Sequence, residues 1–221
     1  MEKLFSLRLE KLFCFKEDDG TGHSEPYIWP ILLVINDTTL ATSTPVKRIF
    51  KSAAYAQVVL KKDMQQNESA DIPQEIGLFK TRYSDQLKTD YFILIVLLWE
   101  KDETPKKAVL AGYSAFGKSV PSAIADNLPA LAASGNLDEL KNAIIDKVKA
   151  EIRSAIKNSL SNLEKLNVAS GILNLDDIVG PDFKVFKNVQ VTSGLHIFLG
   201  CKSEDEKNLY MITGTVEVTS V

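Results

Sequence analysis

The chain has 221 residues, of which 45% are hydrophobic, so it is long enough and apolar enough to bury a substantial core. Its 26 basic and 29 acidic residues give a formal net charge of -3, and no basic stripe interleaved with aromatic residues runs along it. A nucleic-acid-binding role is therefore disfavoured. We expect a single domain over residues 1–221.

Apolar side chains predict β-strands through the first hundred residues. They alternate with polar ones over 5–15, and they form nearly continuous runs at 27–35 and 91–99. The run at 91–99 is about half as long as a membrane-spanning helix, and Asp90 and Glu100 bound it, so it predicts a buried strand and no transmembrane segment. Shorter strands are predicted at 46–50, 55–60 and 76–83.

The N-terminus and the cysteines indicate the compartment. The first fifteen residues, MEKLFSLRLEKLFCF, alternate charged and apolar side chains, whereas a secretory signal needs an uninterrupted apolar stretch. Cys14 and Cys201 each lie inside an apolar strand-like run, which predicts buried free thiols and favours a reducing environment. The expected localisation is therefore cytoplasmic.

In the middle of the chain, apolar residues recur at every third or fourth position and no longer at every second one. A stripe that includes Val109 and Tyr113 predicts one helix, a turn follows at 134–136, and an apolar stripe over 140–163 predicts a second helix. These form a helical hairpin inserted at about 105–168. The period of two then returns, which predicts about three more strands before the C-terminus.

The stretch EDDGTGHSEPY, residues 17–27, joins two predicted strands and contains four carboxylates and two glycines. Carboxylate oxygens are the ligands that calcium prefers, and glycine allows the backbone to curl around an ion. The ligand spacing of an EF-hand is absent. The stretch is therefore a candidate calcium-binding loop of another kind.

This loop resembles a known family. Residues 19–27 read D-x-x-G-x-S-E-P-Y, which is similar to the first calcium-binding loop of C2 domains. The residues E-K-D-E at 100–103 follow a strand, as the D-x-D of the third calcium loop does in that family. The residues D-I-V-G at 177–180 resemble the end of the same loop. The likeness covers roughly 5–102 and 175–221.

The resemblance implies a mainly β fold, an antiparallel C2-like β-sandwich in which the helical hairpin expands the third calcium loop. It also implies that carboxylates from separate segments converge at one end of the sandwich and bind calcium, linking the domain to an anionic lipid or protein partner. Glutamates stand at two positions where the family usually has aspartate, and their longer side chains would shift the ion or lower its affinity. These candidate metal ligands are Asp19, Glu25, Glu100, Asp102 and Asp177.

Two other functions stay open. One is a calcium-independent protein interaction module that acts through the helical hairpin, whose predicted outer face mixes acidic and basic residues. The other is a nucleotide hydrolase, because residues 112–119 match the phosphate-binding pattern G-x-x-x-x-G-K-S. The helical stripe runs through these glycines, which disfavours a phosphate-binding loop. No residue suggests a catalytic role, so we do not expect an enzyme.

Overall fold

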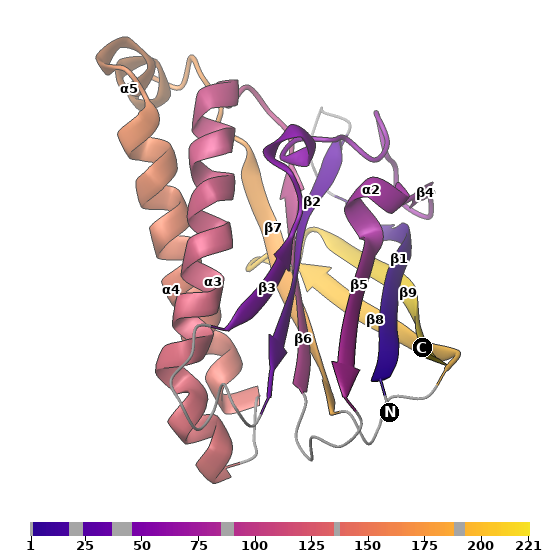
Figure 1. Cartoon of the computed structure of the whole chain (residues 1–221). Coiled ribbons are helices and arrows are strands. Elements are labelled where there is room, and N and C mark those ends of the chain that lie inside the picture. Colours follow the sequence, from indigo (N-terminus) through magenta and orange to yellow (C-terminus); the bar gives the residue numbers. More distant parts are fainter. Residues whose placement is uncertain (1, 18–23, 37–45, 85–90, 135–137, 188–192) are drawn as a thin grey trace.

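The computed structural model describes residues 2–17, 24–36, 46–84, 91–134, 138–187 and 193–221. In these residues the strands form two antiparallel sheets that pack face to face, and a helical hairpin covers the outer face of one sheet (Figure 1). The predicted mainly β fold, an antiparallel sandwich with an inserted helical hairpin, is confirmed.

The first sheet is built around the N-terminal strand. In the described residues its strands follow the order β4-β1-β9-β8, and β5 also pairs with β1. Side chains along β1 alternate between the interior and the solvent, because only one face of this sheet is covered. The bounds are β1 Glu2–Lys16, β4 Ser69–Asp71, β5 Leu78–Ser84, β8 Leu195–Lys202 and β9 Leu209–Ser220.

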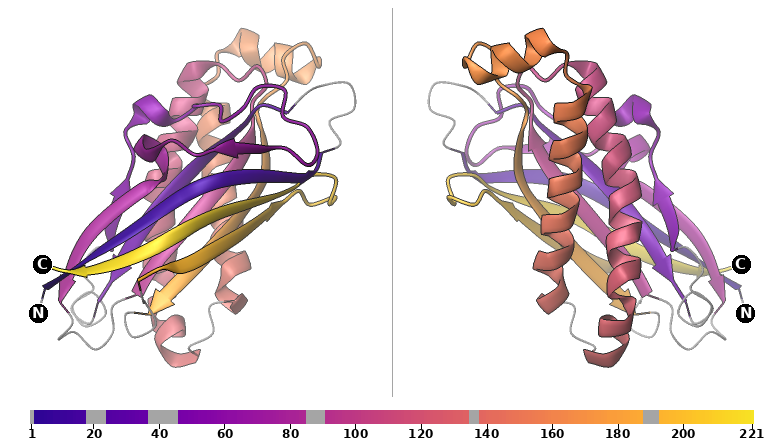
Figure 2. Two further views of the ribbon diagram at one scale, coloured as in Figure 1. Left: turned by 90° about the vertical axis from the view of Figure 1, so that its right-hand side faces the viewer. Right: turned by 90° about the vertical axis from the view of Figure 1, so that its left-hand side faces the viewer.

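The second sheet lies in the middle of the molecule, between the first sheet and the helices (Figure 2). Its order in the described residues is β3-β2-β6-β7. Every residue of β2 and nearly every residue of β6 is buried, as expected for strands covered on both faces. The bounds are β2 Pro26–Ile35, β3 Lys47–Phe50, β6 Tyr91–Glu100 and β7 Asp177–Lys187.

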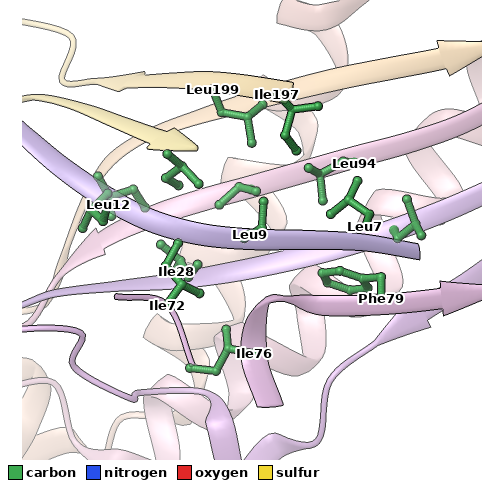
Figure 3. Packing of buried hydrophobic residues seen from close by; sticks show 14 of the residues in the cluster. Leu7, Leu9, Leu12, Ile28, Ile72, Ile76, Phe79, Leu94, Ile197 and Leu199 are labelled. Carbon is green, nitrogen blue, oxygen red and sulfur yellow. The ribbon is translucent and has the colours of Figure 1, made fainter. Parts of the chain in front are cut away.

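Apolar side chains from both sheets fill the space between them (Figure 3). Leu7 and Leu9 of the first sheet lie close to Leu94 of the second, and Ile197 and Leu199 extend this cluster along β8. Cys14 and Cys201 belong to the same cluster as buried free thiols, as predicted.

The helices pack on the second sheet through a separate, aromatic core. Trp29 of β2 and Trp99 of β6 lie with their ring centroids 4.4 Å apart, and Tyr113 and Phe116 of α3 pack against Trp29. None of the described helices combines the length and the apolar character that a membrane-spanning segment needs. The bounds are η1 Ala53–Tyr55, α2 Gln74–Gly77, α3 Lys106–Ser134, α4 Asp138–Ser159 and α5 Asn162–Ala169.

Two local predictions are wrong. The segment 55–60 forms no strand; it begins in the last residue of the 3-10 helix η1 and continues as a turn and irregular backbone, although Val58 and Leu60 pack against the inter-sheet core. The second helix of the hairpin does not continue to residue 163, because α4 ends at Ser159 and a new helix, α5, begins at Asn162.

Candidate functional site

Antiparallel pairing brings three of the predicted metal-binding segments to one end of the second sheet. Pro26 at the start of β2 pairs with Glu100 at the end of β6, and Glu100 pairs with Asp177 at the start of β7. Glu25 immediately precedes Pro26, and Asp102 lies two residues after Glu100. Because α5 lies at the same end of the molecule (Figure 1), we call this region the α5 end.

The carboxylates at the α5 end differ in their surroundings. Glu25 forms an ion pair with Lys101 at 2.5 Å. Glu100 is buried, whereas Asp177 is exposed. Asp19 lies outside the described residues. Within the part of the chain that the structure describes, no group of three or more acidic, histidine or cysteine side chains is arranged to hold a metal ion.

Asp176, which the sequence analysis did not single out, is a buried carboxylate that accepts hydrogen bonds from three separate segments. Its Oδ1 accepts from the backbone N–H groups of Asp102 at 2.9 Å and Thr104 at 3.1 Å. Its Oδ2 accepts from the Tyr27 hydroxyl at 2.8 Å and the Gln57 amide at 2.7 Å. The carboxylate therefore links β2, the segment after η1, and the connection between β6 and α3.

The Tyr27 hydroxyl keeps its proton and donates it in the hydrogen bond to Asp176. Burial, followed by the nearby negative charge of Asp176, raises the pKa of Tyr27 well above its ordinary value. No sequence pattern could have revealed Asp176, because its donors come from segments that are distant in the chain, and two of them are backbone groups.

The short helix α5 is fixed at both ends by hydrogen bonds. At its N-terminus Ser161 and Glu164 form a capping box, in which the Ser161 hydroxyl accepts from the Glu164 N–H at 3.3 Å and the Ser161 N–H donates to Glu164 Oε2 at 2.6 Å. At its C-terminus Gly171 has a positive φ of 74°, and the Ile172 N–H donates to the Asn167 carbonyl at 2.9 Å. This arrangement is a Schellman motif.

Large apolar side chains of α5 point into the solvent. Leu163 and Leu166 are each 67% exposed, and Ile172, just after the helix, is 72% exposed. The two leucines are three residues apart, so they share one face of the helix. Glu164 forms an ion pair with Lys107 of α3 at 2.7 Å, which holds α5 against the start of the hairpin.

The ion pair and hydrogen bonds of Glu164 depend on pH. Hydrogen bonds from Lys107 and Ser161 lower the pKa of Glu164 to about 2. The pKa of Glu164 is lower in the folded protein than in the unfolded chain. These contacts therefore stabilise the folded state at pH values above the ordinary pKa of glutamate. Their contribution is lost as the pH falls towards 2.

A cavity of about 540 Å³ lies beneath α5, between α4, α5 and the start of β7. It is next to the carboxylates described above, because Asp176 and Asp177 belong to its wall. Most of the wall is apolar. The apolar side chains come from β6, from α4 and the residue after it, from α5, and from β7 and the residues before it; they are Trp99, Ile156, Leu160, Val168, Ala169, Leu175 and Ile178.

The sequence motif at 112–119 lies inside the continuous helix α3 and forms no loop. Its two glycines allow close packing. A Cβ atom at Gly112 would lie 2.9 Å from a side-chain carbon of Ile156, and one at Gly117 would lie 2.5 Å from the ring of Phe50. Close packing therefore accounts for glycine at both positions, and this weighs against a phosphate-binding role for 112–119.

The fold described above is that of an antiparallel β-sandwich with a helical hairpin between two strands of one sheet. Similar solved structures include a C2 domain of plant extended synaptotagmin 1, with 8% identity and a TM-score of 0.34, over 99% of this chain and 96% of that one. Another is human GIVD cytosolic phospholipase A2 in complex with an inhibitor and terbium chloride, with 10% identity and a TM-score of 0.34.

The match to the phospholipase covers 100% of this chain but only 18% of the phospholipase chain. Both TM-scores are too low to support a conclusion about function. No protein-family model matches the chain, and no curated protein matches its sequence.

Proposed function

We propose that the protein is a non-catalytic binding module that attaches to an anionic lipid surface through the α5 end. The observation that carries this proposal is the exposure of Leu163, Leu166 and Ile172 on and beside a helix that is fixed by caps at both ends. Exposed apolar side chains that are grouped together mark interaction surfaces, and leucines on a helix that lies at the molecular surface enter the lipid interface readily.

Basic side chains at the same end favour an anionic surface. Lys165 lies between the two leucines in the sequence, and Lys157 is in the last turn of α4. The one acidic residue of α5, Glu164, is paired with Lys107. A lysine close to an anionic membrane surface contributes about 1 kcal/mol to attachment. Figure 2 shows α5 lying across the end of the hairpin, where a flat surface can reach it.

Replacing both leucines should reduce lipid attachment strongly. We expect the variant Leu163→Ser with Leu166→Ser to bind vesicles of phosphatidylcholine and phosphatidylserine at least about tenfold more weakly than the original protein, because two apolar side chains no longer enter the interface. Co-sedimentation with vesicles measures this. Phe198→Ser is the matched control, because Phe198 is also exposed, at 58%, but lies on β8 of the first sheet.

Unchanged pelleting of the double variant would overturn the proposal. Equal binding to vesicles without phosphatidylserine would contradict the role of the lysines. If the original protein fails to pellet with any vesicle, the lipid proposal is wrong, and the calcium-independent protein interaction module becomes the better explanation of the exposed leucines.

We also propose that the α5 end binds calcium weakly, with Asp19, Glu25, Glu100, Asp102 and Asp177 as candidate ligands. The pairing of β2, β6 and β7 supports this, because it brings the last four of these residues to one end of the sheet. Two observations oppose it: calcium must displace Lys101 from Glu25, and the described acidic side chains form no group of three or more arranged around an ion. We therefore expect a dissociation constant of about 1 mM, at the weak end of protein calcium sites.

Removing the competing lysine should strengthen calcium binding. We expect Lys101→Ala to bind calcium several-fold more tightly than the original protein, because the Glu25 carboxylate is released. Isothermal titration of protein stripped with a chelator measures the change, and Lys11→Ala, at an exposed ion pair of the first sheet, is the control. Absence of binding heat at millimolar calcium in both the original protein and Lys101→Ala would rule out the calcium site.

A further inference from the structure

We infer that the cavity beneath α5 binds one single-chain anionic amphiphile of the fatty-acid class. This inference goes beyond attachment to a lipid surface, because it concerns a dissolved ligand in the cavity and not the outward leucines of α5. Three properties of the cavity support it: its size and apolar wall, the basic side chains that line it, and a buried indole group.

The size and the lining of the cavity fit an acyl chain. Its volume of about 540 Å³ lies within the range of small-molecule sites, about 300–1,000 Å³. Its apolar lining includes Ile156 of α4, Leu160 just after that helix, Val168 of α5, and Leu175 and Ile178 at and just before the start of β7. An acyl chain would cover the half-buried side chains of Val168, Leu175 and Ile178 and add to the packing of the buried Ile156 and Leu160.

The charges in the lining select an anionic head group. The cavity lining contains three basic side chains, Arg153, Lys157 and Lys165. It contains two carboxylates, Asp176 and Asp177. The Asp176 carboxylate already accepts four hydrogen bonds, which occupy the oxygen lone pairs that a cationic head group would need. The three basic side chains therefore favour a carboxylate over a cationic head group.

The two tryptophans of the aromatic core differ in the hydrogen bonds of their indole groups. Trp29 donates its indole N–H to the carbonyl of Ala56. Trp99, which lines the cavity and is 1% exposed, has a buried Nε1 with no hydrogen-bond partner among the described residues. A buried donor without an acceptor destabilises a protein, and a ligand oxygen that reached the indole would supply the acceptor.

The ligand class can be tested with soluble fatty acids in the absence of vesicles. We expect octanoate, decanoate and dodecanoate to bind with affinities that rise about fourfold for each added CH₂ group until the cavity is filled. Calorimetry measures the affinity. Intrinsic fluorescence reports the site, because the chain has 2 tryptophans and Trp99 lines the cavity.

The head group is tested by reversing its charge on the same chain. Decyltrimethylammonium should bind at least about tenfold more weakly than decanoate, because Arg153, Lys157 and Lys165 repel it. The double variant Arg153→Glu with Lys157→Glu should weaken decanoate binding and remove this preference. Equal affinities of the two compounds for the original protein would overturn the assignment of an anionic ligand.

A substitution that fills the cavity tests its location. Ala169→Trp adds a large side chain to the wall at a surface position and should abolish decanoate binding. Leu166→Ser, whose side chain is outside the cavity wall, should leave it unchanged. Decanoate binding that persists in Ala169→Trp would overturn the inference. Loss of vesicle binding in the two-leucine variant, with decanoate binding retained, would separate this site from the lipid-attachment surface.

Discussion

Replacing Asp176 by alanine is expected to lower the free energy of unfolding by about 3–5 kcal/mol. The side chain is buried, and its two oxygens accept four hydrogen bonds, including those from Tyr27 and Gln57. Alanine leaves these donors without an acceptor. Each buried donor that loses its partner costs about 1–3 kcal/mol, and those nearest the surface regain water. Urea unfolding followed by circular dichroism measures the change.

Two further variants make this test specific. Asp176→Asn keeps the shape but replaces one acceptor oxygen with an NH₂ group, so we expect a smaller loss of about 2 kcal/mol. Asp177→Ala removes the neighbouring carboxylate, which is exposed, and should change stability by less than about 0.5 kcal/mol in the presence of a chelator. Equal effects of Asp176→Ala and Asp177→Ala would show that the hydrogen bonds of Asp176 do not hold the α5 end together.

Replacing Phe116 by alanine is expected to cost about 3–5 kcal/mol of stability, because it removes a buried ring from the core between the hairpin and the second sheet. Phe116 is 1% exposed and packs against Trp29 and Phe50, with ring centroids 5.9 Å apart in both pairs. The cavity left behind cannot close easily, since both neighbouring rings are held by further aromatic contacts.

The same measurement shows whether the hairpin and the sandwich unfold together. We expect a single unfolding transition for the original protein and for Phe116→Ala, because the aromatic core joins the two parts. Phe198→Ala removes a phenylalanine that is 58% exposed and should change stability by less than about 0.5 kcal/mol. A cost for Phe116→Ala as small as that of Phe198→Ala would contradict the packing of α3 on the sheet.

Much of the fold could be predicted because hydrophobic periodicity reports burial directly. The alternation over 5–15 reflects a strand with one covered face, and the continuous run at 91–99 reflects a strand covered on both faces. The helix boundary at Ser159 was missed because apolar residues continue through Leu160 and Leu163. Only the capping hydrogen bonds of Ser161 show that a new helix begins there.

The candidate site could be predicted only in part. Sequence order and strand pairing were enough to bring the segments around Glu25, Glu100 and Asp177 to one end of the sheet. They could not reveal that Lys101 pairs with Glu25, because a side-chain contact depends on rotamers as well as on register. Nor could they distinguish Asp176 from Asp177, since neighbouring residues point in opposite directions near a strand and only one of the two carboxylates is buried. Calcium ligation by these residues remains a prediction.

Hydrogen exchange of the whole chain, with and without vesicles that contain phosphatidylserine, tests attachment through the α5 end most directly. We expect backbone amides over 162–172 to exchange more slowly with vesicles present, while those of β8 and β9 in the first sheet keep their rates. Unchanged exchange over 162–172 in protein that has bound the vesicles, or slower exchange on the first sheet instead, would contradict the assignment of α5 as the lipid-binding surface.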